Sequence, residues 1–270
     1  MDKQLRVLVI GAHPDDCEYK VGGLAAKFRR NGHKVTFVSM TNGDAGHHVM
    51  SSDSLAERRA AEMRQVAELT GIEYETLGIH DGRLEPDLAT REKLIRLIRN
   101  SKPDLMISHR TNDYHPDHRA TGILVMDASF LIQVPLICPD TPPLSTPPVV
   151  LYMQDNFNKP APFQPDVIVA IDDVYDMKVR MLHCHESQFY EWLPYLDKCN
   201  AEVPQTNADR MEWLKGRIGQ HDTSVARKYQ EALANRYGSA ADAIHYAEAF
   251  EIGEYGRPLP ESEIEGYFPR

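Results

Sequence analysis

The chain has 270 residues, of which 42% are hydrophobic and 26% charged, which is typical of one large globular domain or of one domain with an appendage. Its 40 acidic and 30 basic side chains give a formal net charge of −10, and no basic stripe is visible, which argues against nucleic acid as a partner. No apolar run approaches the roughly 20 residues that span a bilayer, so we expect no membrane segment.

The first residues and the cysteines bear on the cellular compartment. MDKQLRVLVI is a charged leader that runs directly into a strand, which does not resemble a signal peptide. The sequence contains no C-x-x-C pair, so it predicts neither a disulfide framework nor a structural zinc site. We therefore expect a cytoplasmic protein; a signal peptide cleaved from a longer precursor would not be visible. The widely spaced cysteines are Cys17, Cys138, Cys184 and Cys199.

Strand and helix patterns alternate along the first two thirds of the chain. Apolar runs predict strands at residues 6–12, 34–40, 74–79, 104–109, 148–153 and 166–171. Helices are predicted at 22–32, 54–71, 87–101 and 118–133. The second helix has Ser54 as a candidate cap, with Glu57 three residues later. This alternation predicts an α/β fold with a Rossmann-like, mostly parallel sheet and helices on both of its faces.

The remaining segments are less regular. Residues 135–148 hold six prolines, so we expect an irregular excursion there. From Val174 onward the pattern favours helices, and residues 253–270 are expected to be extended. Because no internal repeat or low-complexity tract divides the chain, we predict a single domain over 1–270. It would comprise an α/β core at 1–173 and a mainly helical extension at 174–270.

The first cluster of polar side chains directly follows the first predicted strand. VLVIGAHPDD places His13, Asp15 and Asp16 at the carboxyl end of this strand, where open parallel sheets bind their ligands. Pro14 fits the first turn of a helix, whose N-terminus stabilises the negative charge of the aspartates. For each residue alone, a helix cap or a buried polar contact is an equally good explanation. The turn lacks the G-x-G-x-x-G pattern of a dinucleotide site.

A second cluster follows the predicted strand 104–109, in the sequence HRTNDYHPDH. His115 and His118 lie three residues apart with Asp117 between them. Both clusters should face one crevice, because both lie at the carboxyl ends of strands. Histidines and carboxylates from two loops are the composition of a catalytic zinc site, which has three protein ligands and leaves a position for water. His109 is a fourth candidate, which we interpret as a satisfied polar residue at the strand end.

These motifs together carry a family resemblance. AHPDD after the first strand, TNGDAG after the second, the helix ERRAAEMRQVAELTG and the later HPDH resemble the PIG-L/LmbE-like N-acetylglucosaminyl deacetylases. KVRMLHCHESQ at 178–188 and YAEAF at 246–250 resemble further blocks of that family, so the matches span nearly the whole chain. The resemblance implies a zinc-dependent N-deacetylase that hydrolyses the acetamide of an N-acetylglucosamine-type sugar or glycoconjugate, a small-molecule substrate.

The resemblance also implies a metal site and a base. Its ligands would be His13, Asp16 and His118, which would bind Zn²⁺ or another divalent transition metal. Asp15 would be the general base toward the metal-bound water. Zinc lowers the pKa of such a water to roughly 7, and a general base contributes typically ~10²–10⁴-fold in rate.

Two catalytic side chains and two departures complete this comparison. The resemblance implies that His115 stabilises the oxyanion or protonates the leaving amine, and that Asp117 orients His115 by hydrogen bonding. Cys17 stands where the family usually has Glu directly after the paired aspartates, with Glu18 one place later. We interpret Cys17 as a small buried residue rather than a thiolate ligand. The family often has tyrosine at the position of Asp113, and here Tyr114 is displaced by one residue.

Further side chains are candidates for contact with a sugar. Arg59 could instead pair with Glu62 on an exposed helix face, and aspartates near glycine are also ordinary turn residues. The candidate substrate-binding residues are Arg59, Asp44, Asp81 and Gln188. We interpret the neighbours His47 and His48 as a solvated pair. The aromatic residues Tyr190, Trp192 and Tyr195 fit core packing or the apolar face of a sugar ring, and the sequence does not decide between these two.

Other functions stay open. A metal-dependent phosphoesterase, or a hydrolase of a different amide, could use similar ligands, but the sequence shows ligands for one metal and two-metal phosphatases need more. A sugar-binding protein without turnover would keep the ligands and lose Asp15, which is present here. The N-acetylated substrate is not identified, and a homo-oligomer is possible, with 135–148 as an interface element.

Overall fold

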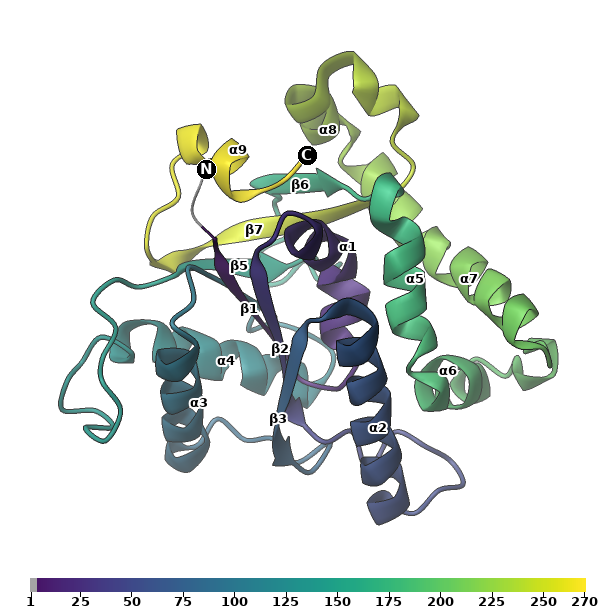
Figure 1. The fold of residues 1–270 in the computed structure, drawn as a ribbon, viewed down its shortest axis with the longest axis horizontal. Coiled ribbons are helices and arrows are strands. Elements are labelled where there is room, and N and C mark those ends of the chain that lie inside the picture. The colour runs from purple at the N-terminus through teal and green to yellow at the C-terminus, as the bar shows by residue number, and fades with distance from the viewer. Residues whose placement is uncertain (1–3) are drawn as a thin grey trace.

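The computed structural model describes residues 4–270, which form a seven-stranded sheet in the order β3-β2-β1-β4-β5-β7-β6 (Figure 1). Strands β1 to β5 pair in parallel, and β7 lies antiparallel between β5 and β6. The predicted fold class, a mostly parallel α/β sheet, is therefore confirmed. The strands are β1 (Arg6–Gly11), β2 (Lys34–Thr41), β3 (Glu73–Ile79), β4 (Leu105–Ser108), β5 (Val149–Met153), β6 (Val167–Ala170) and β7 (Ala247–Gly256).

Helices cover both faces of this sheet. In Figure 1, α3 and α4 lie on one side of the strands and α1, α2 and α5 on the other. The longer helices are α1 (Asp16–Arg30), α2 (Ser52–Thr70), α3 (Leu88–Ser101), α4 (Pro116–Leu131), α5 (Tyr175–His183), α7 (Asn207–Lys228) and α8 (Gln230–Tyr237). The shorter ones are α6 (Leu193–Leu196), α9 (Glu261–Tyr267) and a π-helical turn at Ser187–Trp192. No helix within residues 4–270 combines the length and the apolarity that crossing a membrane requires.

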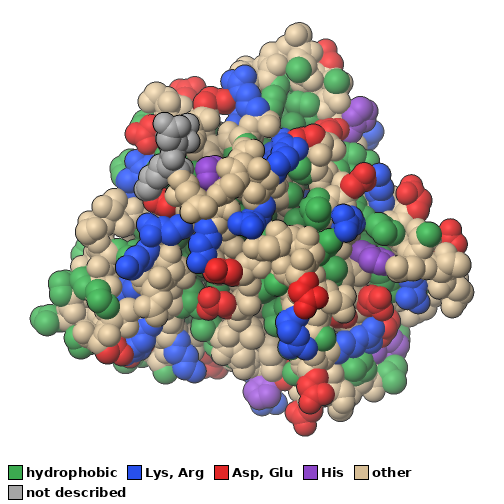
Figure 2. All heavy atoms as spheres, in the orientation of Figure 1, with side chains coloured by type: hydrophobic (Ala, Val, Ile, Leu, Met, Phe, Trp, Pro, Cys, Tyr) green, Lys and Arg blue, Asp and Glu red, His purple; other side chains and the backbone are tan. Residues whose placement is uncertain are grey.

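The alternation of side chains along β1 divides the core into two layers. Val7 and Val9 pack with α1 and α5, whereas Leu8 and Ile10 pack with α3 and α4. This is the period of two that a strand buried on both faces must show. Acidic and basic side chains are interspersed on the face of the molecule seen in Figure 2.

The helix starts differ in detail from the prediction. Helix α2 begins at Ser52, and its cap is Ser51, whose side chain accepts a hydrogen bond from the Ser54 backbone N–H. The predicted capping box at Ser54 and Glu57 is therefore wrong by three residues. Both serines satisfy the same rule, and the sequence alone does not rank them. Residues 135–148, all described, contain neither helix nor strand, as their prolines predicted.

The C-terminal segment contains the main error of the sequence analysis. The expected helices after Val174 are present in α5, α7 and α8, but residues 247–252 belong to strand β7. Of the tail expected to be extended, residues 253–256 are extended within β7, whereas α9 is a helix. The signal of β7 is obscured because Glu248 lies fully inside it, where it accepts hydrogen bonds from the N–H groups of Gly23 and Leu24. Strand β7 completes the core sheet, so the boundary proposed at residue 173 is crossed. A single domain over 1–270 stays our proposal.

Candidate active site

A cavity of about 980 Å³ opens at the carboxyl ends of the parallel strands. Its wall comes from the loops after β1, β2, β3 and β4 and from the π-helical turn. The two polar clusters predicted to share one crevice do meet here. The predicted site residues that line it are His13, Asp15, Asp16, Arg59, Asp81, His115, His118 and Gln188.

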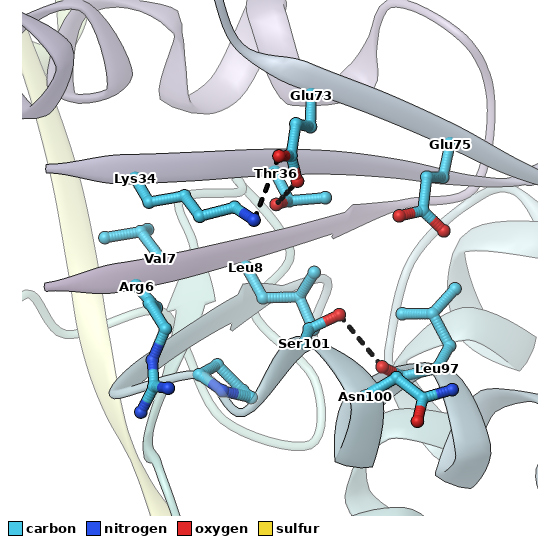
Figure 3. Close-up of a pocket in the computed structure, with 11 residues that line it drawn as sticks. Arg6, Val7, Leu8, Lys34, Thr36, Glu73, Glu75, Leu97, Asn100 and Ser101 are labelled. Carbon is cyan, nitrogen blue, oxygen red and sulfur yellow. Dashed lines mark hydrogen bonds and ion pairs between the residues drawn. The ribbon is translucent and has the colours of Figure 1, made fainter.

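A smaller pocket of about 360 Å³ lies at the opposite, amino ends of the strands (Figure 3). Lys34 and Glu73 are paired across it at 2.9 Å, and Thr36 donates to Glu73 at 3.3 Å. None of the predicted site residues lines this pocket in the described part of the chain. The convergence of histidines and carboxylates is thus specific to the carboxyl end.

The loop after β1 folds back on itself so that Asp16 faces the cavity. Its Oδ2 accepts hydrogen bonds from the backbone N–H groups of Ala12 at 3.0 Å and His13 at 2.8 Å. A Cβ atom at Gly11 would meet the Asp16 Cβ at 2.7 Å, so this turn requires glycine. Burial alone would raise the pKa of Asp16, but the rings of His118 and His109 hold it well below its usual range. Asp16 is therefore an ionised carboxylate.

Three side chains from the two loops have the spacing of a metal site. His13 Nδ1 lies 3.5 Å from Asp16 Oδ2, His118 Nε2 lies 3.5 Å from Asp16 Oδ1, and the two ring nitrogens are 3.3 Å apart. Tetrahedral zinc with bonds of roughly 2.0–2.1 Å separates its ligand atoms by about 3.3–3.4 Å. The residues present therefore fit a divalent transition metal.

Carboxylates behind each histidine determine which ring nitrogen faces inward. His13 Nε2 lies 3.1 Å from both Asp81 Oδ1 and Asp117 Oδ2, so that Nδ1 faces Asp16 and His118. His118 Nδ1 lies 3.0 Å from Asp113 Oδ1, so that Nε2 faces Asp16 and His13. Carboxylate partners of this kind fix the tautomer and orientation of metal-binding histidines. In the sequence Asp113 is only a departure from the family pattern, although its place five residues before His118 is compatible with this contact.

Two further histidines adjoin these three side chains. His109 Nε2 accepts a hydrogen bond from the Ala12 N–H at 3.2 Å, so this nitrogen is already engaged, as the interpretation of a satisfied polar residue predicts. His115 stands edge-on to the His13 ring, with centroids 4.5 Å apart. Burial and the neighbouring rings of His13 and His118 lower the pKa of His115. By distance alone, His13, His115 and His118 could also bind one ion, as could Asp16, His109 and His118.

Asp117 differs from its predicted role. Its carboxylate accepts from the His13 ring and from the N–H groups of Gly82 at 2.7 Å and Leu84 at 3.3 Å, not from His115. Only its backbone N–H reaches His115, at Nδ1 and 3.2 Å. The reason is geometric, because Asp117 lies in the first turn of α4 and faces the loop after β3, whereas His115 is the cap of that helix.

The pKa of the Asp15 carboxyl is raised, whereas that of its neighbour Asp16 is lowered. Burial raises the pKa of Asp15 to about 6, and the Arg59 guanidinium, 3.0 Å from Oδ2, limits this rise. Arg59 is only 1% exposed, so the predicted alternative of a pair with Glu62 on an exposed face is wrong. The Glu62 contact exists, at 3.2 Å, but it is buried.

The other predicted substrate contacts divide into two groups. Asp81 and Gln188 line the cavity, although Asp81 contacts His13 and Gln188 donates to the Gly46 carbonyl at 3.0 Å. Asp44 lies behind the wall, where its oxygens accept from Ser52, from the Asp81 N–H and, at Oδ2, contact His80. We therefore withdraw Asp44 as a substrate contact, because its carboxylate joins two loops.

The neighbouring histidines and the aromatic residues each lie in different environments. His47 is not solvated as predicted, since its Nε2 lies 2.8 Å from Glu191, whereas His48 is exposed and stacks on Tyr195 with centroids 4.0 Å apart. Tyr190 packs in a hydrophobic core cluster, and Trp192 lines the cavity. The π-helical turn presents Trp192 and Gln188 on one side, consistent with the frequent use of π-bulges at functional sites.

The chain is similar in sequence to several known proteins. The model of the PIG-L family, described as GlcNAc-PI de-N-acetylase, matches residues 8–129. The chain is 30% identical over 207 residues to the diacetylchitobiose deacetylase of Thermococcus kodakarensis, covering 71% of this chain and 74% of the relative. It is 25% identical over 200 residues to the 4-oxalmesaconate hydratase of Pseudomonas putida, covering 71% and 77%.

A solved structure also resembles this chain. N,N'-diacetylchitobiose deacetylase from Pyrococcus horikoshii, complexed with its inhibitor, aligns with a TM-score of 0.70 and 26% identity, over 92% of this chain and 83% of that one. The family model, the relative from Thermococcus and this structure all match the resemblance that AHPDD and HPDH indicated. The chain therefore belongs to the PIG-L family, and it is an enzyme.

Proposed function

We propose that this enzyme is a zinc-dependent N-deacetylase that hydrolyses the acetamide of an N-acetylglucosamine-type sugar or glycoconjugate. The observation that carries the proposal is the spacing of His13 Nδ1, Asp16 and His118 Nε2, with the partly buried Asp15, the base that we propose, at the same cavity wall. The names of the deacetylases from Thermococcus and Pyrococcus support the bond that is cleaved.

In this proposal His13, Asp16 and His118 would hold Zn²⁺, which would polarise the acetyl carbonyl and lower the pKa of a water molecule. Asp15 removes a proton from the attacking water as the water oxygen bonds to the acetyl carbon. His115, whose Nδ1 accepts from the Asp117 N–H and whose Nε2 therefore carries the proton, donates a hydrogen bond to the acetyl oxygen as charge develops there. The proton that Asp15 takes from the water passes to the nitrogen as the C–N bond breaks. The products are acetate and the free amine.

The cavity supports a substrate larger than one sugar ring. Its volume of about 980 Å³ is near the upper end of the ~300–1,000 Å³ typical of ligand pockets. Trp192, Leu193 and Leu196 form an apolar part of the wall, which suits the face of a sugar ring or an apolar linked group. We propose Arg59, Asp81 and Gln188 as the polar residues nearest to a bound sugar.

The relative from Pseudomonas is named a hydratase, so addition of water to a carbon–carbon double bond is the second candidate reaction. Both reactions need an activated water and a base. The reaction products distinguish the two candidate reactions, because hydrolysis releases acetate and hydration does not.

The test is acetate release by the zinc-loaded enzyme from N-acetylglucosamine, diacetylchitobiose and N-acetylglucosaminides with acidic, alkyl and aryl substituents. We expect kcat to fall by roughly 10²–10⁴-fold in Asp15→Asn, with stoichiometric zinc retained. Asp87→Asn, at the exposed cap of α3, is the matched control and should keep wild-type kcat. The proposal would be contradicted if the zinc-loaded enzyme released no acetate from any of these substrates, or if Asp15→Asn were as active as the wild type.

A further inference from the structure

Asp15 has a backbone conformation that an aspartate rarely adopts. Its φ is +120° and its ψ −25°, in a region that residues other than glycine rarely adopt. It precedes α1 as the cap residue, yet its side chain makes no capping hydrogen bond to that helix. Such conformations persist only where the surrounding structure holds them, and they cluster at active sites. The Asp15 side chain must therefore be held by contacts outside α1.

Two contacts from different elements do so. Arg59 of α2 donates from Nη2 to Asp15 Oδ2 at 3.0 Å. The Asp15 backbone N–H donates to the hydroxyl oxygen of Tyr74, on β3, at 3.3 Å. Arg59 thus holds the side chain and Tyr74 the backbone N–H of the proposed base, whose carbonyl accepts from the Tyr19 N–H of α1 at 2.8 Å.

Both partners lead to one buried carboxylate, that of Glu18. The Tyr74 hydroxyl donates to Glu18 Oε2 at 3.2 Å, and His185 Nε2 lies 2.7 Å from Glu18 Oε1. Arg59 Nη1 lies 3.5 Å from His185 Nδ1. The contacts therefore close a ring through Asp15, Arg59, His185, Glu18 and Tyr74, in which Glu18 and His185 are fully buried.

We propose that Glu18 is the positioning residue of Asp15 and acts through this ring, an inference that rests on the proposed role of Asp15 as the base. A carboxylate only accepts hydrogen bonds, so it fixes the direction of every donor around the ring. His185 must carry its proton on Nε2 and offer Nδ1 to Arg59. The Tyr74 hydroxyl must point to Glu18, which leaves its lone pair for the Asp15 N–H.

The variant Glu18→Gln tests this assignment with little change of volume. An amide has one oxygen and one NH₂ group, so it cannot accept from both His185 and Tyr74, and one arm of the ring must reverse. Arg59 keeps its second carboxylate partner, Glu62, at 3.2 Å, so no guanidinium is left without a counter-charge. We expect kcat to fall roughly 10- to 100-fold, because small displacements of a catalytic group cost about that much. KM should change less than about twofold.

Repeating the Glu18→Gln substitution in the Asp15→Asn variant distinguishes a positioning role from a general loss of structure. In Asp15→Asn, Glu18→Gln should lower the residual kcat by less than about twofold, because the group it positions is already absent. The same 10- to 100-fold loss in both backgrounds would overturn the proposal, as would a change confined to KM. Glu248→Gln is the matched control, since Glu248 is equally buried beside α1 but has no contact with the ring. It should lower the melting temperature and leave kcat unchanged.

A crystal structure of Glu18→Gln provides a readout that needs no substrate. We expect the Asp15 φ to change sign, or its Oδ2 to move beyond hydrogen-bond distance of Arg59. An unchanged Asp15 would overturn the proposal. If the wild-type enzyme releases no acetate from any substrate, the proposed function fails by itself, and this structure still decides whether Glu18 holds Asp15.

Discussion

Two buried charge networks lie against α1, and they differ in what they reach. The ring of Glu18 extends to Asp15 in the cavity wall. The other network closes on itself: Lys178 Nζ lies 3.0 Å from Asp222 Oδ1 and 2.9 Å from Glu248 Oε1. None of these three side chains lines the cavity. Burial of charge by itself therefore does not mark a functional site. The ring is distinguished by its contact with Asp15, the base that we propose.

The second network joins parts of the chain that are distant in sequence. Lys178 lies on α5, Asp222 on α7 and Glu248 on β7, and Glu248 also accepts from two N–H groups of α1. Burial raises the pKa of Asp222 to about 6, although Lys178 opposes this. Burial alone would lower the pKa of Lys178, but Asp222 and Glu248 raise it. The network thus connects the C-terminal segment to the α/β core.

The largest effect that separates the two networks should come from Lys178→Met. This change leaves two buried carboxylates without their cation, which typically costs about 3–5 kcal/mol of the free energy of unfolding. Denaturant unfolding measures this loss, and kcat of the folded variant should equal that of the wild type. A stable variant with reduced kcat would show that the second network also serves the active site.

A smaller effect is expected from Asp113→Asn, at the cavity. Asp113 holds His118 through Nδ1, and loss of such a partner typically lowers metal affinity about 10- to 100-fold. Competition with a zinc chelator measures the affinity. Asp140→Asn, at an exposed aspartate paired with Arg96, is the control and should bind zinc like the wild type. Equal affinity in Asp113→Asn would mean that the backbone alone orients His118.

Local and long-range contacts differ in how far the sequence predicts them. The α/β sheet and the meeting of AHPDD with HPDH followed from local patterns, because strand periodicity and the position after a strand are local properties. The partners of these residues did not follow. Glu62 reaches Ser187, and Glu18 reaches His185, across more than a hundred residues. Only the packing of α1, α2 and α5 brings them together.

Errors at single residues have the same origin. The motifs predict Asp44 as a substrate contact and Asp117 as the partner of His115, but loops from elsewhere in the chain bind each carboxylate instead. Strand β7 was missed because Glu248 interrupts its apolar pattern, and the cation that makes this burial tolerable lies on another helix. Long-range ionic pairing is not visible in a window of neighbouring residues.

The smallest effect concerns pH and a histidine beside the second network. His221 stacks on Tyr19 with centroids 5.1 Å apart, and burial, with the cations Lys20 and Lys178, lowers the pKa of His221 to about 3. Between pH 6.5 and 3 the unfolded chain binds a proton at this ring that the folded protein does not. Stability therefore falls as the pH drops below about 6.5, by at most about 2 kcal/mol at pH 5.

His221→Gln removes this titration and keeps a polar side chain of similar size. The free energy of unfolding of the variant should fall less than that of the wild type between pH 7.5 and pH 5, by up to about 2 kcal/mol. His245→Gln, at an exposed ring, is the control and should leave the pH dependence nearly unchanged. Because Lys178 is one cause of the shift, the His221 effect should shrink in Lys178→Met. An undiminished effect there would show that burial, rather than the second network, keeps this histidine neutral.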